Sequence, residues 1–255
     1  MIVRALWGQA LGLVAAFGLL YATRAGWGPA QALFLLAAGF LGGVGLAWTA
    51  GPPPSEIRLS PRWTPPAAIA SVAWLFAGVL AMDAFYRALH GVPTPDMTLR
   101  GGPGLLALVA GCAGLLLLHE GVHWAAFRFY GARPRFCLLL KPFPGAAVYA
   151  EHHPLPRWAM AVVMLGPAAL LTLAFGVLLT VPALGAVAVW GAGLNLSGAV
   201  VDFAMAAWLW HLPRGTWVED LRDGVRLLEP AASPAGTDAA PRASRTLAQE
   251  PADAV

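Results

Sequence analysis

Long apolar runs alternate with short polar or proline- and glycine-rich connections along most of the chain. A run of about 20 apolar residues can cross the hydrocarbon core of a bilayer as a helix. The connections contain turn-forming stretches, such as GPPPSEIRLSPRWTPP from Gly51, GVPTPD from Gly91 and VPALG from Val181. The pattern predicts an all-α polytopic membrane protein with about six transmembrane helices. The predicted spans lie near residues 5–23, 29–50, 67–89, 103–130, 157–181 and 184–210.

Two segments outside these spans have patterns of their own. Between the fourth and fifth spans, RPRFCLLLKPFPGAAVYA (Arg133–Ala150) places two short apolar runs around the turn signal KPFPGA, which predicts a hairpin-like linker. An exposed strand edge in such a linker could hold an extended peptide by β-addition. After the last span, apolar residues recur at helical intervals and predict an amphipathic surface helix over 212–230. These residues are Trp217, Leu221, Val225 and Leu228. The tail at 231–255 is rich in Ala, Pro, Ser and Thr and is predicted to be disordered.

Composition supports the membrane assignment and adds an orientation. The chain is 58% hydrophobic and 11% charged, whereas a soluble domain has about 25% charged residues. The net charge of +3 is small and does not indicate a nucleic-acid partner. Thirteen of the 16 basic residues fall on one side if the N-terminus is inside. The positive-inside rule therefore predicts that both termini of this multi-pass protein are cytoplasmic. Arginine outnumbers lysine fifteen to one, and Ala, Gly and Pro abound, which suggests a GC-rich bacterial genome and hence a bacterial cytoplasmic membrane. The inside set is Arg4, Arg58, Arg62, Arg128, Arg133, Arg135, Lys141, Arg157, Arg214, Arg222, Arg226, Arg242 and Arg245, and the outside set is Arg24, Arg87 and Arg100.

The strongest chemical signal is HEGVH, which begins at His119 after sixteen uncharged residues, Pro103 to Leu118. His119 and His123 stand at i and i+4, so both imidazoles project from one face of a helix and can reach one Zn²⁺. Glu120 is not a ligand in this pattern and instead accepts a proton from the water that the metal makes acidic. The alternative is a buried polar cluster that holds helices together. The sequence favours a zinc site.

A catalytic zinc ion needs a third protein ligand besides the two histidines. The histidines lie roughly 12–18 Å from the predicted cytoplasmic end of the fourth span, and Asp202 lies roughly 13 Å from that end of the sixth. This match in depth favours Asp202 as the third ligand. The other candidates are Glu151, His152, His153, His211 and the acidic residues of the tail. Among them, the pair His152 and His153 is the main alternative, provided that its loop dips inward.

Three further features have both a functional and a structural interpretation. Asn195 lies seven residues before Asp202 and therefore shares its face, where its amide could contact the substrate or the developing oxyanion. A plain interhelical contact is an equal alternative. The Gly166-Pro167 pair predicts a bend in the fifth span. Asp83 and Arg87 are most simply an intrahelical pair, and Cys112 and Cys137 form no disulfide framework.

On these residues, the chain resembles the bacterial zincin peptidases allied to site-2-protease-like intramembrane zinc metalloproteases. The resemblance covers roughly Leu106 to Glu229 and implies a zinc metalloprotease core over 103–211, with three accessory helices over 1–102. It implies zinc ligation by His119, His123 and Asp202, the last in the motif NLSGAVVDF, with Glu120 as the catalytic glutamate. The chain departs from the site-2 pattern, because Gly198, Phe203 and Leu170 stand where that pattern has proline, glycine and often asparagine.

Two functions are therefore considered. The first is a zinc-dependent intramembrane protease, whose partners would be the lipid bilayer and a membrane protein or peptide substrate. The second is a non-proteolytic metal-binding scaffold or transporter. Glu120 favours the protease, since a binding site has no need of an acid that is not a ligand. No internal repeat supports an inverted-repeat transporter.

Overall fold

The computed structural model describes residues 1–22, 27–48, 55–58, 60–95, 101–139, 145–222 and 224–228. The predicted disordered tail and the tip of the predicted hairpin, 140–144, lie outside these residues. Among the described residues, five helices are long and apolar enough to cross a membrane, or up to six if one bent pair counts as a span. The helices are α1 (Ile2–Ala22), α2 (Pro29–Trp48), α3 (Thr64–His90), α4 (Gly101–Phe129), α5 (Arg157–Leu178), α6 (Gly185–Gly198) and α7 (Val200–Trp210).

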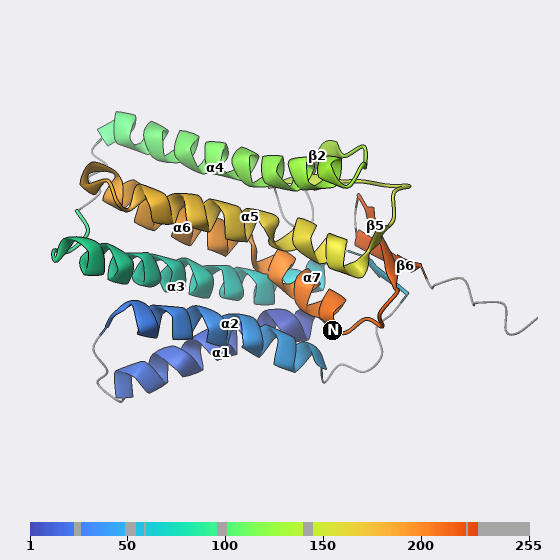
Figure 1. Ribbon diagram of the computed structural model, residues 1–255, viewed down its shortest axis with the longest axis horizontal. Coiled ribbons are helices and arrows are strands. Elements are labelled where there is room, and N and C mark those ends of the chain that lie inside the picture. The colour runs from blue at the N-terminus through green and yellow to red at the C-terminus, as the bar shows by residue number, and fades with distance from the viewer. Residues whose placement is uncertain are drawn as a thin grey trace, which may run out of the picture.

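The helices lie side by side, with α1 and α2 at one edge and α4 at the other (Figure 1). Glycines allow two of the helix pairs to pack with their backbones close together. A side chain on Gly8 or Gly12 of α1 would collide with the backbone of α2 at Gly42 or Ala38. A Cβ atom on Gly78 of α3 would lie 2.8 Å from the Cα atom of Gly193 in α6.

The predicted sixth span is not one straight helix. It consists of α6 and α7, which meet at Ala199 and are bent by 52°. Helix α7 packs against α1, α2 and α3. One buried cluster includes Leu6, Trp74, Met160 and Phe203, from α1, α3, α5 and α7 respectively. The N-terminal helices therefore share a core with the segment that carries the HEGVH motif.

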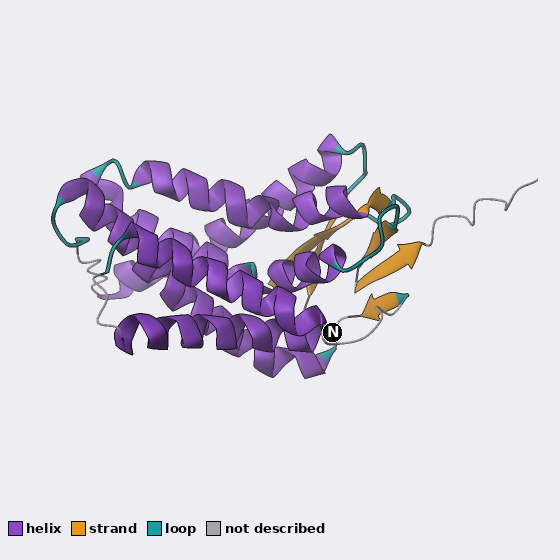
Figure 2. Ribbon diagram, turned by 60° about the horizontal axis from the view of Figure 1, so that its bottom comes forward, coloured by secondary structure: helices purple, strands orange, loops and turns teal. Residues whose placement is uncertain are grey.

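Short strands gather at one end of the helical layer, the end where the chain begins (Figures 1 and 2). Two small sheets are present in the described part of the chain, so the expectation of an all-α protein was too narrow. One sheet is antiparallel with the order β1-β6-β5-β4, and in the other β2 pairs antiparallel with β3. The strands are β1 (Glu56–Arg58), β2 (Arg135–Leu139), β3 (Gly145–Tyr149), β4 (Leu155–Pro156), β5 (Trp217–Leu221) and β6 (Gly224–Leu228).

The prediction of an amphipathic helix over 212–230 is wrong, because Trp217–Leu221 and Gly224–Leu228 within this range form the paired strands β5 and β6. Of the four apolar residues that recur at helical intervals, Trp217 and Leu228 lie opposite each other across the two strands. Leu221 lies opposite Gly224, and Val225 lies opposite Asp220. Strand β1 adds to β6 at the sheet edge, with Ile57 opposite Val225. The segment between α2 and α3 is thereby joined to the C-terminal hairpin.

Candidate metal centre

The two histidines and the glutamate of the HEGVH motif are buried, whereas most residues of α4 from Leu105 to Leu118 are exposed. His119, Glu120 and His123 are 6%, 8% and 5% exposed, whereas Leu117 and Leu118 just before them are more than half exposed. The motif residues offer ligand atoms that all lie within 4.8 Å of one another. The side chains of the motif therefore point into the protein, whereas the leucines just before them face outward.

The break between α6 and α7 brings Asp202 to the two histidines. Asp202 lies in the first turn of α7. Its Oδ2 atom is 3.1 Å from His119 Nε2 and 3.5 Å from His123 Nε2. The sequence predicted that Asp202 and the two histidines lie at the same depth. In the structure their side chains are in contact, across α4 and α7.

Both histidine rings are also held through Nδ1, the ring nitrogen that does not face Asp202. His123 Nδ1 lies 2.9 Å from the carbonyl oxygen of Val163, which can only accept, so this nitrogen donates. His119 Nδ1 lies 3.0 Å from Asn195 Oδ1. The Asn195 amide nitrogen donates to Pro167 O and Thr172 Oγ1, both at 3.3 Å, which orients its oxygen toward His119. Both Nδ1 atoms therefore carry the hydrogen of the neutral ring, and both Nε2 lone pairs face Asp202.

The donor set fits zinc. Two imidazole nitrogens and one carboxylate oxygen are ligands that zinc takes in catalytic sites. With bonds of about 2.0–2.2 Å, neighbouring ligands of a tetrahedral zinc ion lie about 3.3 Å apart. The spacings of 3.1 and 3.5 Å between Asp202 and the two histidines bracket that value.

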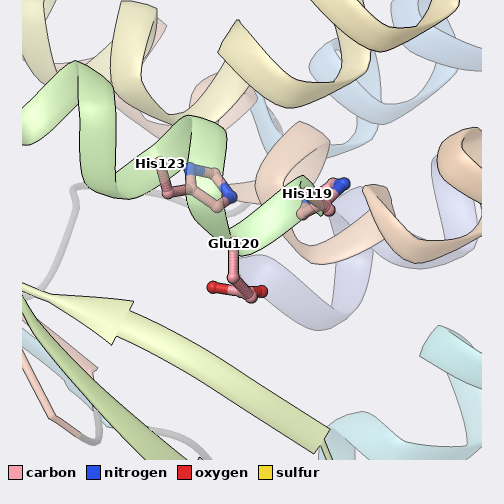
Figure 3. Close-up of side chains that lie close together, drawn as sticks. All are labelled: His119, Glu120 and His123. Atoms are coloured by element: carbon pink, nitrogen blue, oxygen red, sulfur yellow. The ribbon is translucent and has the colours of Figure 1, made fainter. Parts of the chain in front are cut away.

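Glu120 points toward the strands, in a different direction from the two histidine rings (Figure 3). Its Oε2 atom accepts a hydrogen bond of 2.9 Å from the backbone N–H of Val148 in β3. Glu120 therefore lies between the histidine pair and β3. This is the position of an acid that can act on a water molecule or a peptide next to the metal without binding the metal itself.

All four side chains line a cavity of about 400 Å³. One part of its wall is apolar and includes Cys112, Leu116, Val201 and Met205. Another part is formed by strands, with residues Ala146 to Tyr149 of β3 and Asp220 to Arg222 at the end of β5. The cavity thus extends from the long apolar helices to the strand layer.

A comparison with protein families identifies this region. The family model described as "Putative zincin peptidase" matches residues 112–217. The 112–217 segment belongs to this zincin peptidase family. No curated protein and no solved structure matches the chain.

The family match agrees with the chemistry of the donor set. The description of this family implies a metallopeptidase whose cofactor is zinc, and the His-Glu-His group is placed to bind a metal ion. The matched segment begins at Cys112 in α4 and ends at Trp217, the first residue of β5. It therefore includes the HEGVH motif, β3 and Asp202, whereas α1, α2 and α3 lie outside it.

Other residues considered from the sequence lie elsewhere in the protein. The His152 side chain is 93% exposed and lies 3.7 Å from Glu219, and His153 Nε2 lies 3.1 Å from Tyr130 O. Neither residue lines the cavity of the metal centre. Asp83 and Arg87 form the predicted intrahelical pair at 2.7 Å.

Asp220 is a cavity residue that the sequence analysis did not single out, because its segment was predicted to be a surface helix. It is 8% exposed and lines the cavity from β5. Burial raises the pKa of Asp220 well above its usual range, the N–H of Ala150 acts in the opposite direction, and the charges of Asp202 and Glu120 raise it further. The Asp223-Gly224 dipeptide, typical of a tight hairpin turn, was the signal that could have placed Asp220 on a strand.

Proposed function

We propose that the protein is an intramembrane zinc metalloprotease that hydrolyses peptide bonds of membrane-embedded or membrane-proximal segments. His119, His123 and Asp202 hold the zinc ion, and Glu120 is the general base. The position of Glu120 carries this proposal. It shares a cavity with the three donor atoms but is hydrogen-bonded to a strand edge.

The strand β3 has an edge suited to a peptide. In an antiparallel pair, alternate residues point their N–H and C=O groups away from the partner strand. The N–H of Val148 points toward Glu120, so the outward-facing residues of β3 are Val148 and Ala146. A substrate held in extended form along this edge, with main-chain hydrogen bonds, would lie beside Glu120. The extended form matters because a helical segment keeps its carbonyl groups in its own hydrogen bonds.

The roles of the individual residues follow from their contacts. Zinc, when bound, supplies the Lewis acidity that lowers the pKa of water toward neutrality. Glu120 takes the proton from the attacking water and passes it to the leaving amine. Asn195 keeps His119 in the tautomer that offers Nε2. Because its amide groups already bond to protein atoms, this role replaces the direct contact with substrate considered from the sequence.

The alternative is a metal-binding scaffold or transporter without proteolysis. Such a protein has no use for an acid that is buried beside the donor atoms without belonging to the ligand set. Apart from Glu120 and Asp202, the described helices α1 to α7 contain one acidic residue, Asp83, and so lack the series of ionisable groups that an ion pathway requires.

Substrate trapping tests the proposal. Membrane proteomes are compared from cells that carry the wild type, Glu120→Gln or Glu219→Gln. Glu219→Gln is a matched control, because Glu219 is buried but does not line the cavity. We expect at least one membrane protein to remain uncut and to co-purify with Glu120→Gln alone. Identical proteomes in all three strains would favour the scaffold.

A further inference from the structure

A buried amide in α1 contacts the helix that carries Asp202. Gln9 is 1% exposed and lies in the middle of an apolar helix. Its Nε2 atom donates to Val200 O at 3.2 Å, and its Oε1 atom accepts from Trp74 Nε1 at 2.8 Å. A buried polar group is tolerated only when it is hydrogen-bonded, and here both ends of the amide have partners.

These contacts reach α7 on both sides of Asp202. Val200 is the first residue of α7 and lies two positions before Asp202. Phe203 lies one position after it, and its ring packs against that of Trp74 with centroids 4.7 Å apart. Gln9 of α1 thus holds the backbone at Val200, and Trp74 of α3 holds the side chain of Phe203.

The start of α7 needs such support because it follows a break. A continuous helix fixes each turn through the hydrogen bonds of the preceding one, but the first turn after a break lacks part of this ladder. The two segments are bent by 52° at this point. Asp202 lies in that first turn, yet its Oδ2 atom is within 3.5 Å of two imidazole nitrogens on α4.

We propose that Gln9 and Trp74 are positioning residues of the metal centre, which fix the first turn of α7 so that Asp202 faces His119 and His123. This inference rests on the proposed role of Asp202 as a zinc ligand. The inference assigns a function to α1 and α3. They support, from outside the matched segment 112–217, a site whose donor atoms all lie within that segment.

The test is the zinc affinity of the full-length protein in lipid nanodiscs, measured by competition with a chromophoric chelator. The variants are Gln9→Met, which removes the amide with little change in volume, and Trp74→Phe, which removes the indole N–H together with part of the ring. Trp27→Phe is the matched control, because Trp27 Nε1 makes a similar bond of 3.0 Å to Leu80 O that does not involve α7. We expect Gln9→Met and Trp74→Phe to weaken zinc binding about 10- to 100-fold, as loss of outer support does at other zinc sites. Trp27→Phe should bind zinc as the wild type does.

The double variant Gln9→Met/Trp74→Phe separates positioning from general stability. Each single variant leaves one buried polar group without its partner, whereas the double variant leaves neither side chain with such a group. We therefore expect the Tm of the metal-free protein to be higher in the double variant than in Trp74→Phe, while its zinc affinity stays low. Recovery of both together would overturn the inference, because the contacts would then be merely structural.

Asp202→Ala distinguishes the two ways in which the account can fail. Wild-type zinc affinity in Gln9→Met and Trp74→Phe, with weakened affinity in Asp202→Ala, would overturn the positioning role alone. Wild-type affinity in Asp202→Ala would overturn the proposed ligand set and, with it, this inference.

Discussion

At the residue scale, the part of the metal centre that lies within one helix was predictable. The spacing of His119 and His123 fixes their relative position, because both belong to the same turn of α4. Asp202 could be matched to them by depth, since both positions are counted from the same membrane surface. The partner of His119 Nδ1 was not predictable, because Asn195 reaches it only through the bend between α6 and α7.

Asn195 gives a prediction at this scale. Asn195→Ala removes the acceptor that holds His119 Nδ1, and we expect zinc affinity to fall about 10- to 100-fold. Thr172→Ala removes one acceptor of the Asn195 amide but leaves the contact with His119, so its effect should be much smaller. Chelator competition measures both. Equal affinities in Asn195→Ala and wild type would show that the tautomer of His119 does not depend on Asn195.

At the element scale, hydrophobic patterns identified the long helices but not the strands. Trp217, Leu221, Val225 and Leu228 satisfy a helical period, yet they pack as a hairpin whose edge is covered by β1. The sequence pattern could not reveal that β1 pairs with β6, because β1 lies in the connection between α2 and α3, far from β6 along the chain. The bend of the sixth span was missed for a similar reason, since its support comes from α1 and α3.

The contact between α1 and α2 makes a prediction about stability. A methyl group at Gly8 would collide with the backbone oxygen of Gly42, and overpacking of this kind costs about 1–3 kcal/mol. Gly8→Ala should therefore lower the Tm. Gly18→Ala, in the same helix but with no atom near the added methyl group, should leave the Tm unchanged or raise it. The same fall in both variants would contradict close backbone packing at Gly8.

Asp220 makes stability depend on pH. Burial raises the pKa of Asp220 well above its usual value, so the folded protein favours the protonated form more than the unfolded chain does. Stability contributed by this group is therefore complete below the unfolded pKa of about 3.9 and is lost as the pH rises through the raised folded pKa. Asp220→Asn should raise the Tm at pH 8 relative to wild type, and the difference should shrink as the pH falls.

The neighbouring glutamate supplies a control with the opposite sign. Glu219 lies 3.4 Å from Arg226, so Glu219→Gln should lower stability by up to about 1 kcal/mol at neutral pH. Melting curves of both variants across pH 4–8 make the comparison. A wild-type pH profile in Asp220→Asn would show that Asp220 does not control this dependence.

At the scale of the whole molecule, the fold collects the strands and the N-terminus at one end. Arg58, Arg135 and Arg226 lie in these strands, and Arg87 lies in the last turn of α3, which ends on the opposite side. We propose that the strand end faces the cytoplasm, as the asymmetry of basic residues predicts.

Cysteine labelling in intact cells tests this orientation. Cys112 and Cys137 are first replaced by alanine, and single cysteines are then introduced at Val92 or at Arg214, both exposed. A membrane-impermeant thiol reagent should label Val92→Cys but should label Arg214→Cys only after the cells are opened. Labelling of Arg214→Cys in intact cells would reverse the proposed orientation.

The most direct test of the central claim measures zinc content and peptide cleavage side by side in Glu120→Gln and Asp202→Ala, with a substrate captured by trapping. If Glu120 is the general base, Glu120→Gln should retain one zinc ion per chain and lose about 10²- to 10⁴-fold in turnover. Asp202→Ala should instead bind zinc more weakly, because only two histidines remain in the ligand set. Full cleavage by Glu120→Gln, or loss of zinc from Glu120→Gln with its retention in Asp202→Ala, would contradict the account.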